Sequence, residues 1–147
     1  MKIGIASDHR GYKLKNGIIN SMKNYEFIDL GTYSEESTDY PLYGIKLGES
    51  LINNEFDYGV LICGTGIGIS IACNKVKGIR CARITSKEDA MWCRRDNDAN
   101  VIAFGENTNI NNAIEMVNEF INTEFLNEER FIRRKKEITD YEEKNES

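Results

Sequence analysis

The sequence contains a single histidine, a single proline and no apolar run of the roughly 18 residues that a membrane-spanning helix requires. One histidine leaves few ligands for a metal, and the spacing of the four cysteines matches no zinc or iron–sulfur pattern. Acidic residues outnumber basic ones, and the net charge of −5 argues against a general nucleic-acid or anionic-membrane surface. The N-terminal residues MKIGIASDH become polar too early for a secretory signal. These absences predict a cytoplasmic protein with no metal centre and with neither nucleic acid nor membrane as a partner.

What is present is an alternation of short apolar runs with longer segments of helical period. The 147 residues are enough for one domain and too few for two comfortable ones. Strands this apolar, repeated in β–α units, indicate a parallel sheet that helices cover on both faces. The predicted strands are Lys2–Ala6, Tyr25–Leu30, Tyr58–Ile62, Ile79–Ile84 and Val101–Phe104. The predicted helices lie near Gly11–Lys23, Pro41–Ile52, Ile67–Asn74, Lys87–Arg94 and Asn109–Phe125.

The last part of the chain, from Asn127 to Ser147, is highly charged. Its first half is compatible with a helix that Asn127 caps. The residues from Glu142 to Ser147 are predicted to form a frayed tail. Elsewhere, Ser86 followed three residues later by Asp89 resembles an N-cap box. The sequence therefore predicts a single domain over residues 1–141, followed by a short tail.

The most informative segment is GVLICGTGIGISIACNK, residues 59–75. An apolar run ends at Cys63, and a loop with glycine at 64, 66 and 68 leads into helix-compatible residues. This arrangement points several backbone N–H groups and the positive end of a helix at one spot. It is not a dinucleotide fingerprint, because Ile69 stands where a third glycine is needed, and no Gly-Lys-Ser/Thr follows for a P-loop. It predicts a nest of amides for an oxyanion or a carboxylate-sized group, with a turn that uses glycine for packing alone as the alternative.

Cys63 lies at the rim of this loop. The amides and the helix end there favour the thiolate form of a thiol, which can act as a nucleophile or as a general base. Thr65 can hydrogen-bond a substrate oxygen or cap the following helix. A Cys-His hydrolase pairing of Cys63 with His9 is conceivable but has no local signature. The remaining cysteines are predicted to be small buried hydrophobes: Cys73, Cys81 and Cys93.

Polar residues of other loops are expected at the same edge, because parallel sheets bind their ligands outside the carboxyl ends of the strands. Asp8 and His9 follow the first predicted strand, and structural and catalytic roles for His9 are about equally supported.

Arg130 and Arg134 are spaced i,i+4, so on a helix they share a face and can clamp a phosphate. The alternative for these arginines is a solvated basic face paired with neighbouring glutamates.

Five segments of the chain resemble, in their order, those of one protein family. They are SDHRGYKLK near the N-terminus, TDYP at 38–41, ICGTGIGISIACNK at 62–75, NDANV at 97–101 and the pair Arg130 and Arg134. Together they resemble the ribose-5-phosphate isomerase B family, which also includes the galactose-6-phosphate isomerase subunits. The resemblance implies a three-layer, Rossmann-like α/β fold with a five-stranded parallel sheet, and an enzyme without metal or cofactor. It also implies a homodimer with a shared active site, and leaves open whether two dimers form a tetramer.

The resemblance implies a role for each matching residue. Cys63 is the base that moves a proton between the first two sugar carbons through an enediolate, and Thr65 helps to hold the developing oxyanion. The loop amides that would hold the same oxygen belong to Gly64, Gly66, Ile67 and Gly68. The residues implied for the sugar and phosphate pocket are Asp8, His9, Tyr43, Arg130, Arg134 and, from the partner subunit, Asn97.

Two positions depart from the family's pattern. Asp96, kept as a candidate catalytic residue, stands where the family has a ring-opening histidine, and an ionised aspartate is a poor acid. Either burial keeps Asp96 protonated, or another group opens the ring, or ring opening relies on the equilibrium in solution. Asn107, kept as a candidate substrate-binding residue, stands where such isomerases commonly carry a phosphate-binding arginine. Phosphate binding should be weaker unless Arg10 or Arg133 takes over.

The sequence therefore predicts an aldose–ketose isomerase that interconverts D-ribose 5-phosphate and D-ribulose 5-phosphate. The presence of both Asp8-His9 and the arginine pair favours this hypothesis over a galactose-6-phosphate, or other hexose-6-phosphate, isomerase subunit. Two further alternatives are a sugar-phosphate-binding subunit that has lost ring opening at Asp96, and a flavodoxin-like nucleotide binder.

Overall fold

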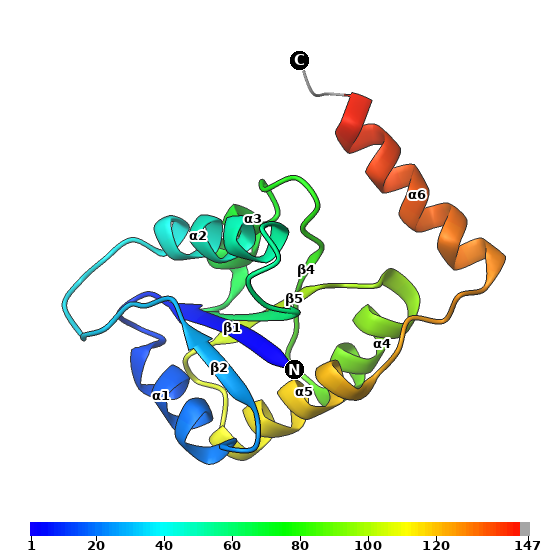
Figure 1. The fold of residues 1–147 in the computed structure, drawn as a ribbon. Helices are drawn as coiled ribbons and strands as arrows, with labels where there is room; N and C mark the ends of the chain where they lie inside the picture. Colours follow the sequence, from blue (N-terminus) through cyan, green and yellow to red (C-terminus); the bar gives the residue numbers. More distant parts are fainter. Residues whose placement is uncertain (145–147) are drawn as a thin grey trace.

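Five parallel strands form the centre of the molecule, and helices cover both faces of the sheet (Figure 1). The computed structural model describes residues 1–144. The strands are β1 (Lys2–Ser7), β2 (Glu26–Asp29), β3 (Tyr58–Cys63), β4 (Cys81–Arg83) and β5 (Val101–Gly105). The helices are α1 (Tyr12–Ser21), α2 (Tyr40–Ile52), α3 (Ile67–Cys73), α4 (Lys87–Asn97), α5 (Ile110–Asn122) and α6 (Glu129–Lys144). The predicted three-layer, Rossmann-like α/β fold is confirmed.

The strand order is β2-β1-β3-β5-β4, and each neighbouring pair is parallel. After β1 the chain adds β2 on one side and then places β3 on the other side of β1. This reversal is a topological switch point, the place where open α/β sheets bind ligands. Helices α2 and α3 cover one face of the sheet, and α1, α4 and α5 cover the other (Figure 1).

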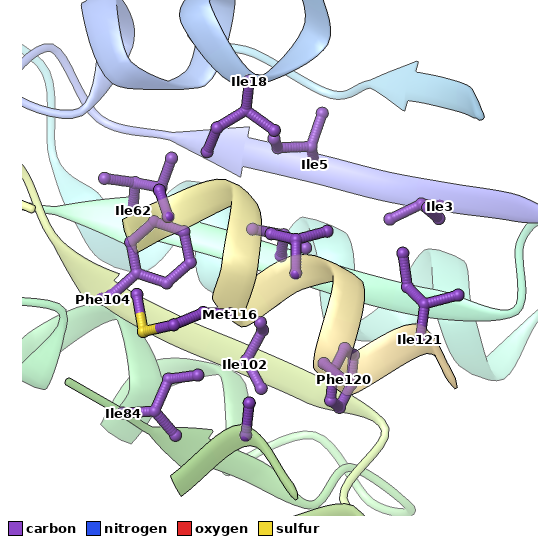
Figure 2. Close-up of a cluster of buried hydrophobic side chains, with 14 of the residues drawn as sticks. Ile3, Ile5, Ile18, Ile62, Ile84, Ile102, Phe104, Met116, Phe120 and Ile121 are labelled. Carbon is purple, nitrogen blue, oxygen red and sulfur yellow. The ribbon is translucent and has the colours of Figure 1, made fainter. Parts of the chain in front are cut away.

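Strand side chains alternate between two hydrophobic cores, because successive residues of a strand point to opposite faces. Ile5, Ile62 and Phe104 enter the core that α1 and α5 cover (Figure 2). Leu61 and Cys63 enter the other core, under α2 and α3. The register of β3 therefore turns the thiol of Cys63 toward α2 and α3.

Helix α4 begins where the sequence predicts and ends later. Ser86 Oγ accepts a hydrogen bond from the Asp89 N–H at 3.1 Å, so the predicted N-cap is confirmed. The helix continues past Arg94 to Asn97 and ends at Asp98, whose φ of +50° is left-handed. The extra turn carries two of the predicted site residues. The edge strands β2 and β4 are shorter than predicted, because their ladders with β1 and β5 extend only over Glu26–Asp29 and Cys81–Arg83.

The C-terminal helix α6 packs against α4 and stands away from the sheet (Figure 1). It continues through Lys144, so the tail predicted from Glu142 is helical over its first three residues, and residues 145–147 lie outside the described part of the chain. The helix begins at Glu129, and the Glu128 carbonyl accepts the N–H groups of Phe131 and Ile132, so Glu128 holds the cap position and the predicted cap at Asn127 is wrong. Over residues 1–144, no helix is long and apolar enough to cross a membrane.

Candidate active site

The carboxyl ends of β1 and β3 lie side by side at the switch point, because Ser7 of β1 is in register with Ile62 of β3. The loops that follow these strands therefore meet, as predicted for a parallel sheet. They border a pocket of about 390 Å³. Its lining residues are Asp8, Arg10, Tyr40, Cys63, Gly64, Thr65, Ile67 and Gly68. All but Arg10 and Tyr40 are residues that the sequence predicts for the site.

Cys63 is the last residue of β3, and its side chain is buried. The backbone N–H of Gly66 donates a hydrogen bond to its Sγ at 3.2 Å. Gly66 has a φ of +80°, and a Cβ there would lie 2.6 Å from the backbone of Phe104, so the turn requires glycine. This tight turn holds the thiol at the start of α3, where backbone amides converge.

The other three cysteines are free thiols outside the lining of this pocket. A hydrogen bond with Cys73, together with burial, raises the pKa of the Cys81 thiol well above its ordinary value. Burial raises the pKa of the Cys93 thiol to about 12. Cys81 and Cys93 are therefore protonated at neutral pH and do not compete with Cys63 as a nucleophile or base. Cys73 and Cys93 are buried as predicted, whereas Cys81 is half-buried.

Two amides of the glycine loop have partners within the loop itself. The N–H of Gly66 donates to Cys63, as described, and the N–H of Ile67 donates to Thr65 Oγ1 at 3.1 Å. Thr65 thus accepts the first N–H of α3 from the position before the N-cap, which is Gly66 and makes no side-chain cap bond. Its hydroxyl hydrogen is not used in that bond, so it can donate to a substrate oxygen.

Asp8 follows β1 and is a buried carboxylate. Its Oδ1 accepts the backbone N–H groups of Arg10 and Gly11 at 3.0 and 3.2 Å. These bonds close the turn that leads into α1. Asp8 therefore shapes the first loop as well as lining the pocket.

His9 and Tyr43 are joined through Thr38. The Nδ1 atom of His9 lies 3.2 Å from both the amide nitrogen and the carbonyl oxygen of Thr38. The Thr38 hydroxyl lies 3.2 Å from the Tyr43 hydroxyl. Hydrogen bonds with Thr32 and Thr38 lower the pKa of Tyr43. The segment that contains TDYP thus ties these two predicted residues to each other, and neither belongs to the pocket lining.

Asn107 lies on the far side of the glycine loop. It lines a polar pocket of about 350 Å³ that shares Gly64 and Thr65 with the pocket of Cys63. Arg83 also lines this second pocket, and its Nε donates to the Thr65 carbonyl at 3.1 Å. A guanidinium therefore lies on this side of the loop although residue 107 is not basic.

Four predicted site residues lie on other elements and do not line the pocket of Cys63. Asp96 and Asn97 are in the last turn of α4, and Arg130 and Arg134 are exposed on α6. Asp96 is half-buried, and its carboxylate lies 3.2 Å from Arg95 Nε. This carboxyl group is therefore partly exposed and has a charge partner.

The basic residues of α6 differ in their pairing. Arg130 pairs with Glu128 at 2.6 Å, and Arg133 pairs with Glu129 at 2.7 Å. Among the described residues, Arg134 has no ion pair. The predicted pairing with neighbouring glutamates is therefore confirmed for Arg130, and Arg134 presents a free guanidinium.

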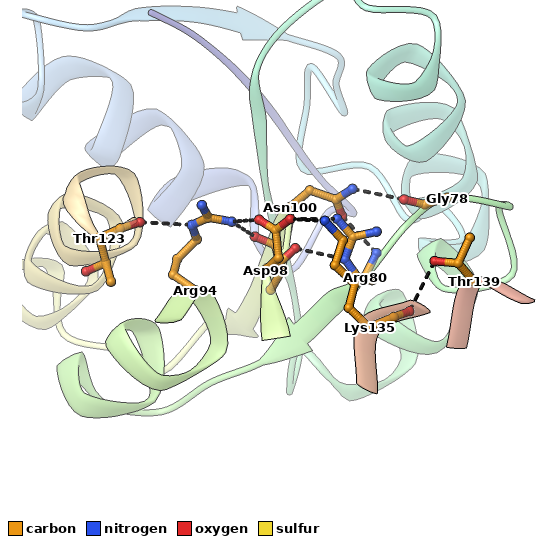
Figure 3. A network of polar contacts seen from close by, with 9 residues as sticks. Gly78, Arg80, Arg94, Asp98, Asn100, Thr123, Lys135 and Thr139 are labelled. Carbon is orange, nitrogen blue, oxygen red and sulfur yellow. Dashed lines mark hydrogen bonds and ion pairs between the residues drawn. The ribbon is translucent and has the colours of Figure 1, made fainter. Parts of the chain in front are cut away.

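Asp98 joins the end of α4 to α6 (Figure 3). Its Oδ1 accepts a hydrogen bond from Arg94 Nη1 at 2.7 Å, its Oδ2 accepts one from Lys135 of α6, and its carbonyl accepts one from Arg80 Nε. Burial acts to raise the pKa of Asp98, but the hydrogen bonds from Lys135 and Arg94 outweigh it, and the pKa is lowered. Arg94 is buried and stacks 5.0 Å from the ring of Tyr58. The network fixes α6 relative to the last turn of α4, so the four site residues on these helices form one unit.

Asp98→Asn is expected to lower the free energy of unfolding by about 3 kcal/mol, because it leaves the buried Arg94 guanidinium without its charge partner. The control Asp140→Asn, which breaks an exposed pair with Lys136 on α6, should change it by less than about 0.5 kcal/mol. In the wild type, the contribution of Asp98 is complete above its ordinary pKa of 3.8 and is lost as the pH falls through the lowered folded-state pKa. Urea unfolding at neutral and acid pH measures both effects. Equal stability of the two variants would show that the network does not hold α6.

Tyr40 is a pocket residue that the sequence pattern does not reveal. It is the first residue of α2, and its ring lies against Gly68, where a Cβ would be 2.7 Å from the ring. The sequence indicates only that a helix starts near Pro41. The contact itself depends on how α2 packs against α3.

Known proteins resemble this chain over nearly its whole length. A model of the ribose/galactose isomerase family matches residues 3–138. A putative sugar phosphate isomerase of Bacillus subtilis is 44% identical over 149 residues, covering 99% of each chain. The structure of ribose-5-phosphate isomerase B from Clostridium thermocellum matches with a TM-score of 0.95 at 45% identity, over 99% of this chain and 100% of that one. The Mycoplasma genitalium enzyme of the same name, solved with bound ribulose-5-phosphate, matches with a TM-score of 0.89 at 34% identity, over 98% and 97% of the two chains. This chain therefore belongs to the ribose/galactose isomerase family, as its motifs predict.

Proposed function

We propose that this protein interconverts D-ribose 5-phosphate and D-ribulose 5-phosphate. The observation that carries the proposal is the position of Cys63 Sγ beneath an amide-rich loop at the switch point of the sheet. Isomerisation of a sugar needs a base beside hydrogen-bond donors that stabilise negative charge on oxygen. The proton leaves a carbon next to a carbonyl, and the electrons move onto the carbonyl oxygen. The bound ribulose-5-phosphate of the Mycoplasma genitalium structure supports a pentose as the substrate.

In the proposed mechanism, the thiolate of Cys63 takes the proton from C2 of open-chain ribose 5-phosphate. The electrons of the C–H bond form the C1–C2 double bond, and those of the carbonyl move onto O1, which gives the enediolate. The Thr65 hydroxyl and the amides of Gly64 and Gly68 hold this oxygen, while the amide of Gly66 holds the sulfur. Cys63 then returns the proton to C1, and the O2 proton passes to O1 as the C2 carbonyl of ribulose 5-phosphate forms.

The ribose ring must open before this proton transfer, and we assign that step to Asp96. In this step the Asp96 carboxylate takes the proton of the anomeric hydroxyl, the bond between C1 and the ring oxygen breaks as the C1 carbonyl forms, and the ring oxygen takes the proton from the Asp96 carboxyl. The contact with Arg95 Nε orients the carboxylate for this exchange.

We infer that a second copy of the chain completes the site. The unit formed by α4 and α6 does not line the pocket of its own chain, and its free Arg134 guanidinium suits a substrate phosphate. Exposed isoleucines on α3 and α6 offer apolar surface for such an association: Ile67, Ile71, Ile132 and Ile138. In this arrangement, Asp96, Asn97, Arg130 and Arg134 of one copy face the Cys63 pocket of the other.

The test is turnover of the purified protein with ribose 5-phosphate and, separately, with ribulose 5-phosphate. Allose 6-phosphate and galactose 6-phosphate serve as six-carbon controls. We expect conversion in both directions, with kcat/KM for the pentoses at least about tenfold above that for the hexoses. Turnover of hexoses alone would replace the proposed substrate, and binding of all four sugars without turnover would indicate a binding subunit.

A further inference from the structure

Arg10 is a cation of the Cys63 pocket that the mechanism above does not use. It lies in the loop after β1, and its guanidinium lies against Gly64, the residue that follows Cys63. A Cβ added to Gly64 would be 2.9 Å from Nη1 and 3.1 Å from Cζ of Arg10. The guanidinium therefore borders the turn that carries the thiol.

Glu106, from the loop after β5, holds Arg10 in this place. The Oε2 atom of Glu106 lies 2.5 Å from Arg10 Nε. Among the described residues, this oxygen has no partner with hydrogen-bond geometry, so the contact is an ion pair. The backbone of Glu106 is anchored in turn, because its N–H donates to the Cys63 carbonyl at 2.9 Å. A carboxylate on Nε leaves the Nη1 and Nη2 edge of the guanidinium available, and that fork matches the oxygens of a phosphate.

The exposure of the pocket residues fixes which end of a substrate meets Arg10. Cys63 is 4% exposed as a whole residue, whereas the side chain of Arg10 is 56% exposed. The reacting carbons must reach the buried sulfur, so the strongly hydrated phosphate stays at the open side of the pocket. Arg10 is the one cation in this lining among the described residues. Arg133, the other cation considered from the sequence, is held by Glu129 through two contacts of 2.7 and 2.8 Å.

We propose that Arg10 binds the phosphate group of the substrate directly, oriented by Glu106. This inference rests on the proposed sugar-phosphate isomerase function and adds a binding residue from the same chain as Cys63. The phosphate then meets guanidinium groups of both copies, Arg10 from one and the α6 arginines from the other.

The test compares Arg10→Gln and Arg10→Lys with the control Lys13→Gln. Lys13 is a neighbouring cation that is 85% exposed and lies outside the pocket lining. We expect Arg10→Gln to raise KM for ribulose 5-phosphate on the order of tenfold, with kcat changed by less than about twofold. The inhibition constant of inorganic phosphate should rise by a similar factor. Both constants of Arg10→Lys should lie between those of the wild type and of Arg10→Gln, because an ammonium keeps the charge but lacks the two parallel N–H donors of a guanidinium. Both constants of Lys13→Gln should match those of the wild type.

Unchanged KM and unchanged phosphate inhibition in Arg10→Gln would overturn the inference while leaving the isomerase function standing. If the wild type turns over neither pentose, the proposed function falls, and calorimetric titration with ribose 5-phosphate decides the role of Arg10. Weaker binding by Arg10→Gln than by Lys13→Gln then supports it, and equal binding overturns it. Thermal melting identifies a variant that fails to fold, in which case Arg10→Lys carries the comparison.

Discussion

Cys63→Ala should lower kcat for both pentose phosphates by about 10³-fold or more, because no other group replaces the thiolate as the base at C2. KM should change little, since the phosphate supplies most of the binding and lies away from the sulfur. The fold should persist, because alanine is smaller than cysteine and the main loss is the acceptor for the Gly66 N–H, worth about 1 kcal/mol. Steady-state kinetics in both directions, together with thermal melting, measures these effects.

Two further variants sharpen this test. Cys63→Ser keeps an acceptor for the Gly66 amide but offers a hydroxyl in place of the thiolate, so it should be about as inactive as Cys63→Ala. Cys73→Ala removes a buried thiol from α3 outside the pocket lining and should leave kcat within about twofold of the wild type. Substantial turnover by Cys63→Ala would exclude the thiol as the base.

A mixture of two inactive variants is expected to regain activity if each site combines two copies. Arg130→Gln/Arg134→Gln removes the α6 guanidinium groups and should raise KM about 100-fold or more through lost charge-assisted bonds to phosphate. When this variant and Cys63→Ala are refolded together at equal concentration, half of the dimers are mixed, and each mixed dimer has one intact site. The mixture should therefore show about a quarter of the wild-type activity at low substrate concentration.

The matched control is a mixture of Cys63→Ala with Cys63→Ser, in which no dimer has an intact site. It should stay as inactive as either variant alone. If the first mixture also shows only the sum of its separate activities, the arginines act in the pocket of their own chain or do not bind substrate. Size-exclusion chromatography of each mixture checks that dimers are present.

Much of the fold could be predicted from local pattern, because each apolar run is bounded by polar or glycine-containing segments and fills one of two cores. The length of α6 could not. Its last residues are charged and resemble a solvated tail, yet Glu142 Oε1 accepts the backbone N–H of Gly78 at 2.6 Å. That bond joins the end of the chain to the connection between α3 and β4. No property of the C-terminal residues alone indicates it.

The candidate site likewise has a part that the sequence predicts and a part that it does not. Cys63 and its glycine loop could be predicted because strand, turn and helix are contiguous in the sequence. The pairing of Arg10 with Glu106 could not, since these residues follow different strands and meet only because the loops after β1 and β5 both reach the loop after β3. Spacing likewise shows that Arg130 and Arg134 share a helix face, but not which pocket that face serves.

Because Asp98 couples α4 to α6, the accepted substrate length and the proton transfer depend on different parts of the protein. The α6 arginines that would hold the far end of the substrate move with that helix, whereas the thiol and Arg10 are fixed by the sheet and the loops that follow its strands. A change in the way α6 docks would alter the distance between the α6 arginines and the thiol without disturbing the proton-transfer centre. Within a family whose members act on sugars of different length, substrate size could then diverge through the C-terminal helix while the chemistry at the sheet stays the same.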